Sequence, residues 1–78
     1  MKIDDELKQD FILLGKQIRK LRQERNLTIQ EISKITGISI QYLTKIETGL
    51  AYGVLMGRHL LKISNAFQVK FSDLFKYN

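Results

Sequence analysis

Gly37 separates two short segments that each carry the signals of a helix, and this arrangement restricts the fold more than any other feature of the sequence. Before the glycine, Thr28 begins a T-x-x-E capping box, in which a hydroxyl and a carboxylate satisfy backbone N–H groups of the first helical turn. After the glycine, Ser39 is a typical N-cap residue. The link consists only of residues 36–38, and glycine adopts the positive φ of a tight turn at little cost. The sequence therefore predicts two short helices joined by a three-residue turn over about residues 28–48.

Apolar residues repeat at intervals of three and four on both sides of this pair, which is the pattern of amphipathic helices. The spacing predicts a long first helix from about Asp5 to Arg25, ended by Asn26 in a left-handed conformation. Two more helices are predicted: one in RHLLKISNAF, after a loop that includes Gly57, and a last short one capped by Ser72. The short helix between Thr28 and Gly37 is expected to bury three residues: Ile29, Ile32 and Ile35. No alternating run is long enough for a sheet, so the expected fold is all-α with five helices.

The chain is basic, and its charge is unevenly distributed. The formal net charge of the 78 residues is +5 at pH 7; residues 1–10 hold two lysines and four acidic residues, a net −2, which leaves +7 for residues 11–78. A basic domain behind an acidic leader indicates a polyanionic partner, nucleic acid ahead of an anionic membrane, although solubility alone also explains such a charge. A chain of this length is near the lower limit for a stable core without disulfides or metal, so we expect a very regular helical core or a partner subunit.

Several kinds of site cannot be assigned in this sequence. It contains no cysteine, which excludes disulfides, Cys-ligated zinc and a thiol nucleophile. One histidine, no glycine-rich phosphate loop and no recognisable constellation of carboxylates leave no catalytic site to assign. No apolar run approaches the roughly 18 residues of a membrane span, and the acidic start lacks the apolar segment of a signal peptide. The sequence thus predicts a cytoplasmic protein that is not an enzyme, with no cofactor, metal, membrane or small-molecule ligand.

Two short helices joined by a turn with a central glycine form a helix-turn-helix motif. Around this motif, LGKQIRKLRQERNLT, EISKITGISIQYLTKIETG and LLKISNAFQVKFSDLF resemble the lambda repressor/Cro superfamily of DNA-binding domains, also called XRE-like, over about residues 13–76. The resemblance implies an all-α, five-helix lambda-repressor-like DNA-binding domain over residues 11–78, with the helix-turn-helix at its second and third helices. The acidic leader, residues 1–10, then either continues the first helix or frays from it.

The resemblance also implies a function. Proteins of this superfamily are sequence-specific transcriptional regulators, and the expected form is a small homodimeric autorepressor or controller. Such a protein reads a pseudo-palindromic operator in double-stranded DNA, because one short helix makes too few base contacts for a selective site. The expected location is the nucleoid of a bacterial or phage-type system.

The third helix carries the residues expected to read DNA bases. At about 100° per residue, Gln41, Thr44 and Lys45 fall on the face opposite Leu43. The major groove admits one α-helix, and glutamine, threonine and lysine present groups that pair with base edges. By resemblance these three residues reach into the groove. Ile40 also occupies an edge-reading position, where it could only contact a thymine methyl or cover apolar surface.

Residues that flank this helix are expected to contact phosphates. By resemblance these are Thr28, Thr48 and Arg58, and we add Gln30 and Tyr42 as candidates. Tyr42 has packing against the second helix as its alternative role. A solvated helix face without a function is the alternative for the polar residues of both sets.

Other residues are expected to shape the domain. The resemblance implies a mostly buried ion pair of Arg22 with Glu47, which fixes the orientation of the third helix relative to the first. It also assigns Ser33 and Gly37 to the helix-turn-helix turn, where a small Ser33 lets the two helices approach. Three apolar residues near the C-terminus are candidates for the dimer contact: Phe71, Phe75 and Tyr77. Their alternative role is to close the monomer core.

The sequence departs from the family pattern in ways that keep a second function open. Ile29 stands where the family usually has a glutamine that touches DNA, and with Ile40 it makes the expected DNA surface less polar. The segment after Gly49 is about two residues longer than usual and lacks the common proline, so this loop is a candidate contact to DNA or to a second subunit. The pairs Tyr42-Leu43 and Ile46-Glu47 are similar to those of RodZ-like cytoskeletal anchors, which use this fold to bind protein. The alternative function is therefore a protein-docking module.

Overall fold

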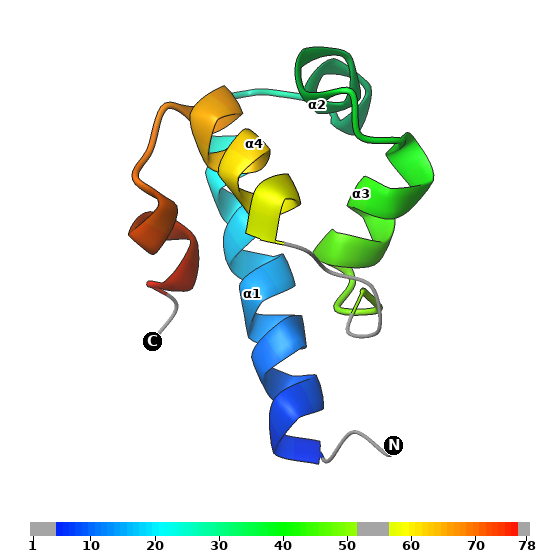
Figure 1. The fold of residues 1–78 in the computed structure, drawn as a ribbon, viewed down its shortest axis with the longest axis vertical. Helices are drawn as coiled ribbons and strands as arrows, with labels where there is room; N and C mark the ends of the chain where they lie inside the picture. The colour runs from blue at the N-terminus through cyan, green and yellow to red at the C-terminus, as the bar shows by residue number, and fades with distance from the viewer. Residues whose placement is uncertain (1–4, 52–56, 77–78) are drawn as a thin grey trace.

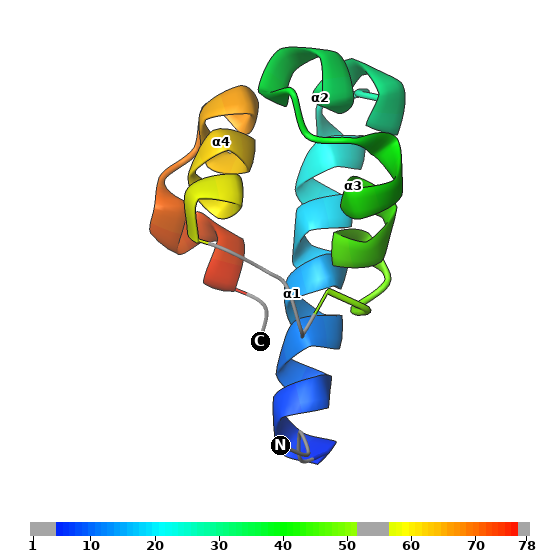
Figure 2. The same ribbon diagram turned by 45° about the vertical axis from the view of Figure 1, so that its right-hand side comes forward.

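The computed structural model describes residues 5–51 and 57–76, and over these residues the chain is helical, without a strand. The elements are α1 (Asp5–Glu24), α2 (Ile29–Thr36), α3 (Ile40–Glu47), α4 (Gly57–Phe67) and the 3-10 helix η1 (Phe71–Phe75). Figure 1 shows α1 as the long central helix, with α3 on one side of it and η1 on the other. Helix α2 lies across one end and contacts both α3 and α4, and Figure 2 shows the first turns of α1 extending beyond the other elements. The predicted all-α class is confirmed, although the fifth helix is a 3-10 helix.

Apolar side chains from every helix meet in one core. Its buried residues are Leu14, Ile18, Leu21, Ile32, Ile38, Leu43, Ile46, Ala51, Leu60, Ile63, Phe67 and Leu74. In α1 and α4 these residues follow the intervals of three and four that predicted the helices. Leu74 is as fully buried as Ile63, each with 0% of its surface exposed, so the short η1 closes the core that the four α-helices build.

The chain ends and starts its helices where the capping signals predicted. Asn26, which follows α1 after Arg25, has φ of 55°, and Gly37 has φ of 76° directly after α2. The Thr28 hydroxyl accepts a hydrogen bond from the Glu31 N–H, and the Glu31 carboxylate accepts one from the Thr28 N–H, each at 3.0 Å. Ser39 caps α3 by accepting from the Tyr42 N–H at 3.1 Å. The capping box and the N-cap are therefore confirmed.

Three predictions about the fold are wrong in detail. Ile35 is 60% exposed, because α2 presents only a narrow buried face around Ile32 to its neighbours. Gly57 is the first residue of α4 and not part of the preceding loop. Ser72 does not cap the last helix: η1 begins one residue earlier, and the Asp73 carboxylate accepts from the Lys70 N–H at 3.0 Å. The Asp73 carboxylate therefore caps the start of η1.

Side chains of α1 and of the residue that follows it connect the C-terminal elements to the rest of the domain. The Gln17 amide donates to the Asp73 carbonyl oxygen at 3.1 Å, which attaches η1 to α1. The Arg25 guanidinium donates to the Phe67 carbonyl oxygen at 2.8 Å and lies 5.7 Å from the centre of the Phe67 ring. Because these bonds satisfy carbonyl groups at the end of α4 and within η1, they keep both elements in place against α1.

Candidate nucleic-acid interface

Helix α3 is placed by an unusually close approach to α1. A Cβ atom at Gly15 would lie 2.7 Å from the Glu47 carbonyl oxygen, so only glycine lets the two helices pack at this distance. Gly49, with φ of 79°, continues the contact, since a Cβ there would lie 2.9 Å from the Ile12 Cα. An isolated glycine inside a helical pattern, as at Gly15, is the sequence signal of such close packing.

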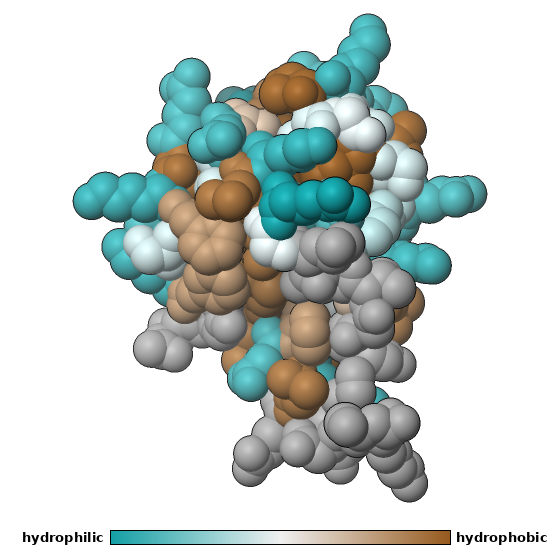
Figure 3. Space-filling model, viewed as in Figure 1, coloured by the Kyte–Doolittle hydropathy of each residue, from teal (hydrophilic) through white to brown (hydrophobic). Residues whose placement is uncertain are grey.

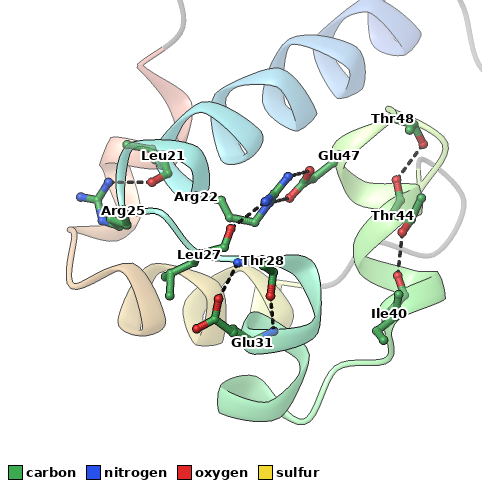
Figure 4. A network of polar contacts seen from close by, with 10 residues as sticks. All are labelled: Leu21, Arg22, Arg25, Leu27, Thr28, Glu31, Ile40, Thr44, Glu47 and Thr48. Carbon is green, nitrogen blue, oxygen red and sulfur yellow. Dashed lines mark hydrogen bonds and ion pairs between the residues drawn. The ribbon is translucent and has the colours of Figure 1, made fainter.

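The predicted ion pair of Arg22 and Glu47 is present and forms a two-point contact. Arg22 Nε donates to Glu47 Oε2 at 2.7 Å and Nη2 donates to Oε1 at 3.1 Å. The third nitrogen, Nη1, donates to the Leu27 carbonyl oxygen at 2.7 Å (Figure 4). Only 13% of the Arg22 side chain and 8% of the Glu47 side chain are exposed. The pair therefore connects α1, the segment just before α2 and the end of α3 at one mostly buried point.

The turn between α2 and α3 is held by hydroxyl groups as well as by Gly37. The Ser33 hydroxyl donates to the Ile38 carbonyl oxygen at 2.6 Å. The Thr36 hydroxyl donates to the Ile32 carbonyl oxygen at 2.7 Å and accepts from the Ile38 N–H at 3.1 Å. Ser33 thus contributes a hydrogen bond in addition to its small size. These bonds and the burial of Ile38 set the direction in which α3 leaves the turn.

The outward side of α3 carries the predicted base-reading residues. Leu43 and Ile46 are each 2% exposed and face the core. Gln41, Thr44 and Lys45 are exposed, and Ile40 is 45% exposed. The structure therefore brings these four residues together on the accessible surface of a helix whose opposite side is anchored. Such a surface has the dimensions and donor and acceptor groups that a major groove accepts.

The predicted phosphate-contacting residues lie at several places around α3. Thr28 and Gln30 are exposed at the first turn of α2, where the positive end of the helix dipole favours an anion. Thr48 is exposed at the end of α3, and its hydroxyl donates to the Thr44 carbonyl oxygen at 2.8 Å. Arg58 is exposed in the first turn of α4.

The Tyr42 side chain packs against α4, and its packing against α2, the alternative role in the sequence analysis, stays a prediction. Its ring centre lies 4.7 Å from that of His59, with 52° between the ring planes. This contact places the first turn of α4, including Arg58, beside α3. The pairing of Tyr42 with His59 joins the consecutive helices α3 and α4 across the segment between them, and no local signal in the sequence predicted it.

The surroundings of His59 favour its neutral form. Burial, with smaller effects from the charges of Arg58 and Lys62, lowers its pKa below the ordinary 6.5. Its Nδ1 is buried and has no hydrogen-bond partner among the described residues. The folded state therefore favours the neutral imidazole. The contribution of neutral His59 to the free energy of unfolding is fully present above pH 6.5 and is lost as the pH falls through the lowered folded-state pKa.

We expect the free energy of unfolding in urea to fall when the pH is lowered from about 7.5 to about 5. The slope should be smaller in His59→Phe, which keeps an aromatic ring against Tyr42 but cannot be protonated. Equal slopes in both proteins would contradict this assignment.

Asp73 acts separately at lower pH: hydrogen bonds from the Lys76 side chain and the Lys70 backbone lower its pKa below 3.8, so its stabilising effect is lost only below that value.

The predicted dimer-contact residues lie partly in the described structure. Phe71 and Phe75 are 39% and 41% exposed, and their ring centres are 5.3 Å apart. Figure 3 shows an apolar area on the side of the molecule where Figure 1 places η1. Tyr77 lies outside the described residues. The core is closed by Leu74, which leaves the two phenylalanine rings at the surface.

Within the part of the chain that the structure describes, no helix is both long and apolar enough to cross a membrane.

Comparison with known proteins finds similarity over most of the chain. The HTH-type transcriptional repressor RghR of Bacillus subtilis (strain 168) is 32% identical over 60 residues, which cover 77% of this chain and 44% of RghR. The chain thus spans less than half the length of this curated relative. The crystal structure of the restriction-modification controller protein C.AhdI from Aeromonas hydrophila superposes with a TM-score of 0.81 and 22% identity, covering 86% of this chain and 98% of that protein. At this identity the second match shows the fold alone.

The helix-turn-helix family HTH_3 matches residues 18–74, from the buried Ile18 of α1 to the buried Leu74 of η1. The matched segment includes the turn at Gly37, both partners of the Arg22–Glu47 ion pair and the outward side of α3. This chain therefore belongs to the helix-turn-helix family HTH_3, the XRE-type DNA-binding proteins to which its sequence showed a resemblance.

Proposed function

We propose that this protein is a sequence-specific transcriptional regulator, a small homodimeric autorepressor or controller that acts at the nucleoid. The observation that carries the proposal is the outward side of α3, where Gln41, Thr44 and Lys45 are exposed while Leu43 and Ile46 anchor the helix in the core. The Arg22–Glu47 pair and the contact at Gly15 hold the helix rigidly against α1. A rigid, polar helix face of this kind is suited to the major groove.

In the proposed complex, α3 reads the bases and the neighbouring elements position it by contacting phosphates. Gln41 can form two hydrogen bonds with adenine, and Lys45 can donate to guanine. The Thr28 hydroxyl accepts from the helix and keeps its own proton, which it can donate to a phosphate oxygen. Arg58 would place a positive charge beside α3, on the side marked by the Tyr42–His59 contact.

Dimerisation is part of the proposal because a single α3 reads only a few base pairs. Two copies related by a two-fold axis would read two half-sites about 34 Å apart, one turn of B-DNA. The partly exposed rings of Phe71 and Phe75 support η1 as the contact, since buried aromatic residues supply much of the energy of protein interfaces. Tyr77 belongs to the same proposed contact.

Fluorescence anisotropy with two labelled duplexes tests this function. One duplex is the DNA upstream of the protein's own gene, and the other has the same composition in shuffled order. We expect binding to the upstream duplex to be tighter by a factor of about 10³ or more, and to weaken steeply as salt is raised. Equal, weak binding to both, together with no enriched sequence after selection from random duplexes, would contradict the proposal and favour the protein-docking alternative.

A further inference from the structure

Ile40, Thr44 and Thr48 form a row along the outward side of α3. Residues four apart are neighbours on a helix surface. Figure 4 shows the three side chains in sequence, joined by two hydrogen bonds within the helix. Ile40 is 45% exposed, and both threonines are exposed. The row runs from the first residue of α3 to its C-cap, and it adjoins the exposed Gln41 and Lys45.

The hydroxyl protons of this row are engaged within the helix. Thr44 Oγ1 donates to the Ile40 carbonyl oxygen at 2.9 Å, and Thr48 Oγ1 donates to the Thr44 carbonyl oxygen at 2.8 Å. A hydroxyl has one proton, so neither threonine has a donor left for a base or a phosphate. Each keeps its Cγ2 methyl and the lone pairs of its oxygen. Thr28 differs, because its hydroxyl accepts from the Glu31 N–H.

The apolar groups of this row, the Ile40 side chain and the two threonine methyls, have one complementary apolar group on the base edges of a major groove. This group is the C5-methyl of thymine. If the row faced other base edges, the exposed surface of Ile40 would cover polar groups without pairing with them, which is unfavourable. Polar reading in the same groove is supplied by Gln41 and Lys45, which lie on the neighbouring row and carry amide and ammonium donors.

We infer that the row of Ile40, Thr44 and Thr48 reads thymine C5-methyl groups, while Gln41 and Lys45 read the hydrogen-bonding pattern of adjacent base pairs. The inference rests on the proposed function, since it names the chemistry by which the same surface selects DNA. It assigns each half-site at least one thymine whose methyl group is required for affinity, and it assigns Thr48 to base methyls in place of phosphate.

The test begins with selection of preferred duplexes from a random pool by the full-length protein. Each thymine of the selected half-site is then replaced singly by deoxyuridine, which removes the C5-methyl group and leaves the base pairing unchanged. We expect at least one replacement to weaken binding by about fourfold or more, the effect of burying one methyl group. Uridine replacements outside the contacted base pairs should have no effect.

Protein variants then assign the methyl contacts to side chains. In Ile40→Ala, the ratio of thymine to uridine affinity should fall to about one at the thymine that Ile40 contacts. Thr44→Ser, which removes only the methyl, should lower the ratio of thymine to uridine affinity to about one at a neighbouring thymine. Thr44→Val, which keeps the methyl and removes the hydroxyl, should preserve it. Leu61→Ala is the matched control, because Leu61 is a 50% exposed aliphatic residue on α4.

The outcomes separate this inference from the proposed function. Tight binding to a selected site that tolerates every uridine replacement would overturn the methyl reading and leave the DNA-binding function intact. Thymine dependence that persists in Ile40→Ala and Thr44→Ser, as in Leu61→Ala, would also overturn it. Failure to enrich any sequence would contradict the proposed function, and the inference with it.

Discussion

Gly15→Ala should lower the free energy of unfolding by about 3 kcal/mol or more, at the upper end of the range for overpacked cores. The added Cβ would lie 2.7 Å from the Glu47 carbonyl oxygen and 2.9 Å from the Glu47 carbonyl carbon. Both are backbone atoms, so no side chain can rotate away, and α1 and α3 would have to separate. Alanine favours the helical state of α1 by about 1 kcal/mol relative to glycine, which offsets only part of this cost.

Gly57→Ala is the matched control. It introduces the same methyl group in the first residue of α4, where a Cβ would meet no atom within 4 Å. Urea denaturation should show Gly57→Ala to be as stable as the parent protein or slightly more stable. If Gly15→Ala were equally stable, α1 and α3 could not be packed as closely as described.

Glu47→Ala is expected to cost about 3–5 kcal/mol, because it leaves the Arg22 guanidinium in a mostly buried position without its carboxylate. The double variant Arg22→Met with Glu47→Leu should recover much of this loss, since apolar residues of similar size need no partner. Measured in a double-mutant cycle, the two single effects should therefore not add. Additive losses would show that the two side chains do not depend on each other.

A surface pair provides the comparison for this experiment. Lys76 Nζ lies 2.8 Å from Asp73 Oδ1, with 69% of the lysine side chain exposed. Lys76→Ala should change the stability by less than about 1 kcal/mol, because water and salt screen the exposed pair. The two ion pairs have nearly the same shortest N–O distance, 2.7 and 2.8 Å, but differ in burial. A large effect at Glu47 and a small one at Lys76 would show that burial, and not pairing alone, makes Glu47 important for stability.

Local signals predicted most of the fold because each acts within a few residues. Thr28 and Ser39 begin helices through hydrogen bonds to the next turn, and Asn26 and Gly37 end helices through positive φ angles. None of these needs information from distant parts of the chain. The Arg22–Glu47 pair is a distant contact, and the resemblance to a known superfamily indicated it where spacing could not.

The features that the sequence analysis missed depend on how helices approach each other. Ile35 follows the apolar spacing of Ile29 and Ile32, but periodicity does not say how wide the buried face of a short helix is, and Ile35 is exposed. The need for glycine at position 15 arises from the backbone of α3, more than 30 residues along the chain. The Tyr42–His59 contact likewise joins side chains from separate helices. Which exposed residues touch bases or phosphates stays a prediction.

We propose that the outward side of α3 reads base sequence, and the variant Gln41→Ala is the sharpest test of this function. Gln41 is exposed and uncharged, so the substitution leaves the net charge, and hence the salt-dependent attraction to any DNA, unchanged. Gln23→Ala makes the same chemical change at an exposed position of α1 and serves as the control.

The measurement is the anisotropy-derived Kd of both variants and the parent protein for a selected duplex and a shuffled duplex, at one salt concentration. We expect Gln41→Ala to lose about 1–3 kcal/mol of binding free energy on the selected duplex and almost nothing on the shuffled one, while Gln23→Ala matches the parent protein on both. Equal losses on the two duplexes, or no loss on the selected one, would contradict the claim that Gln41 reads bases from α3.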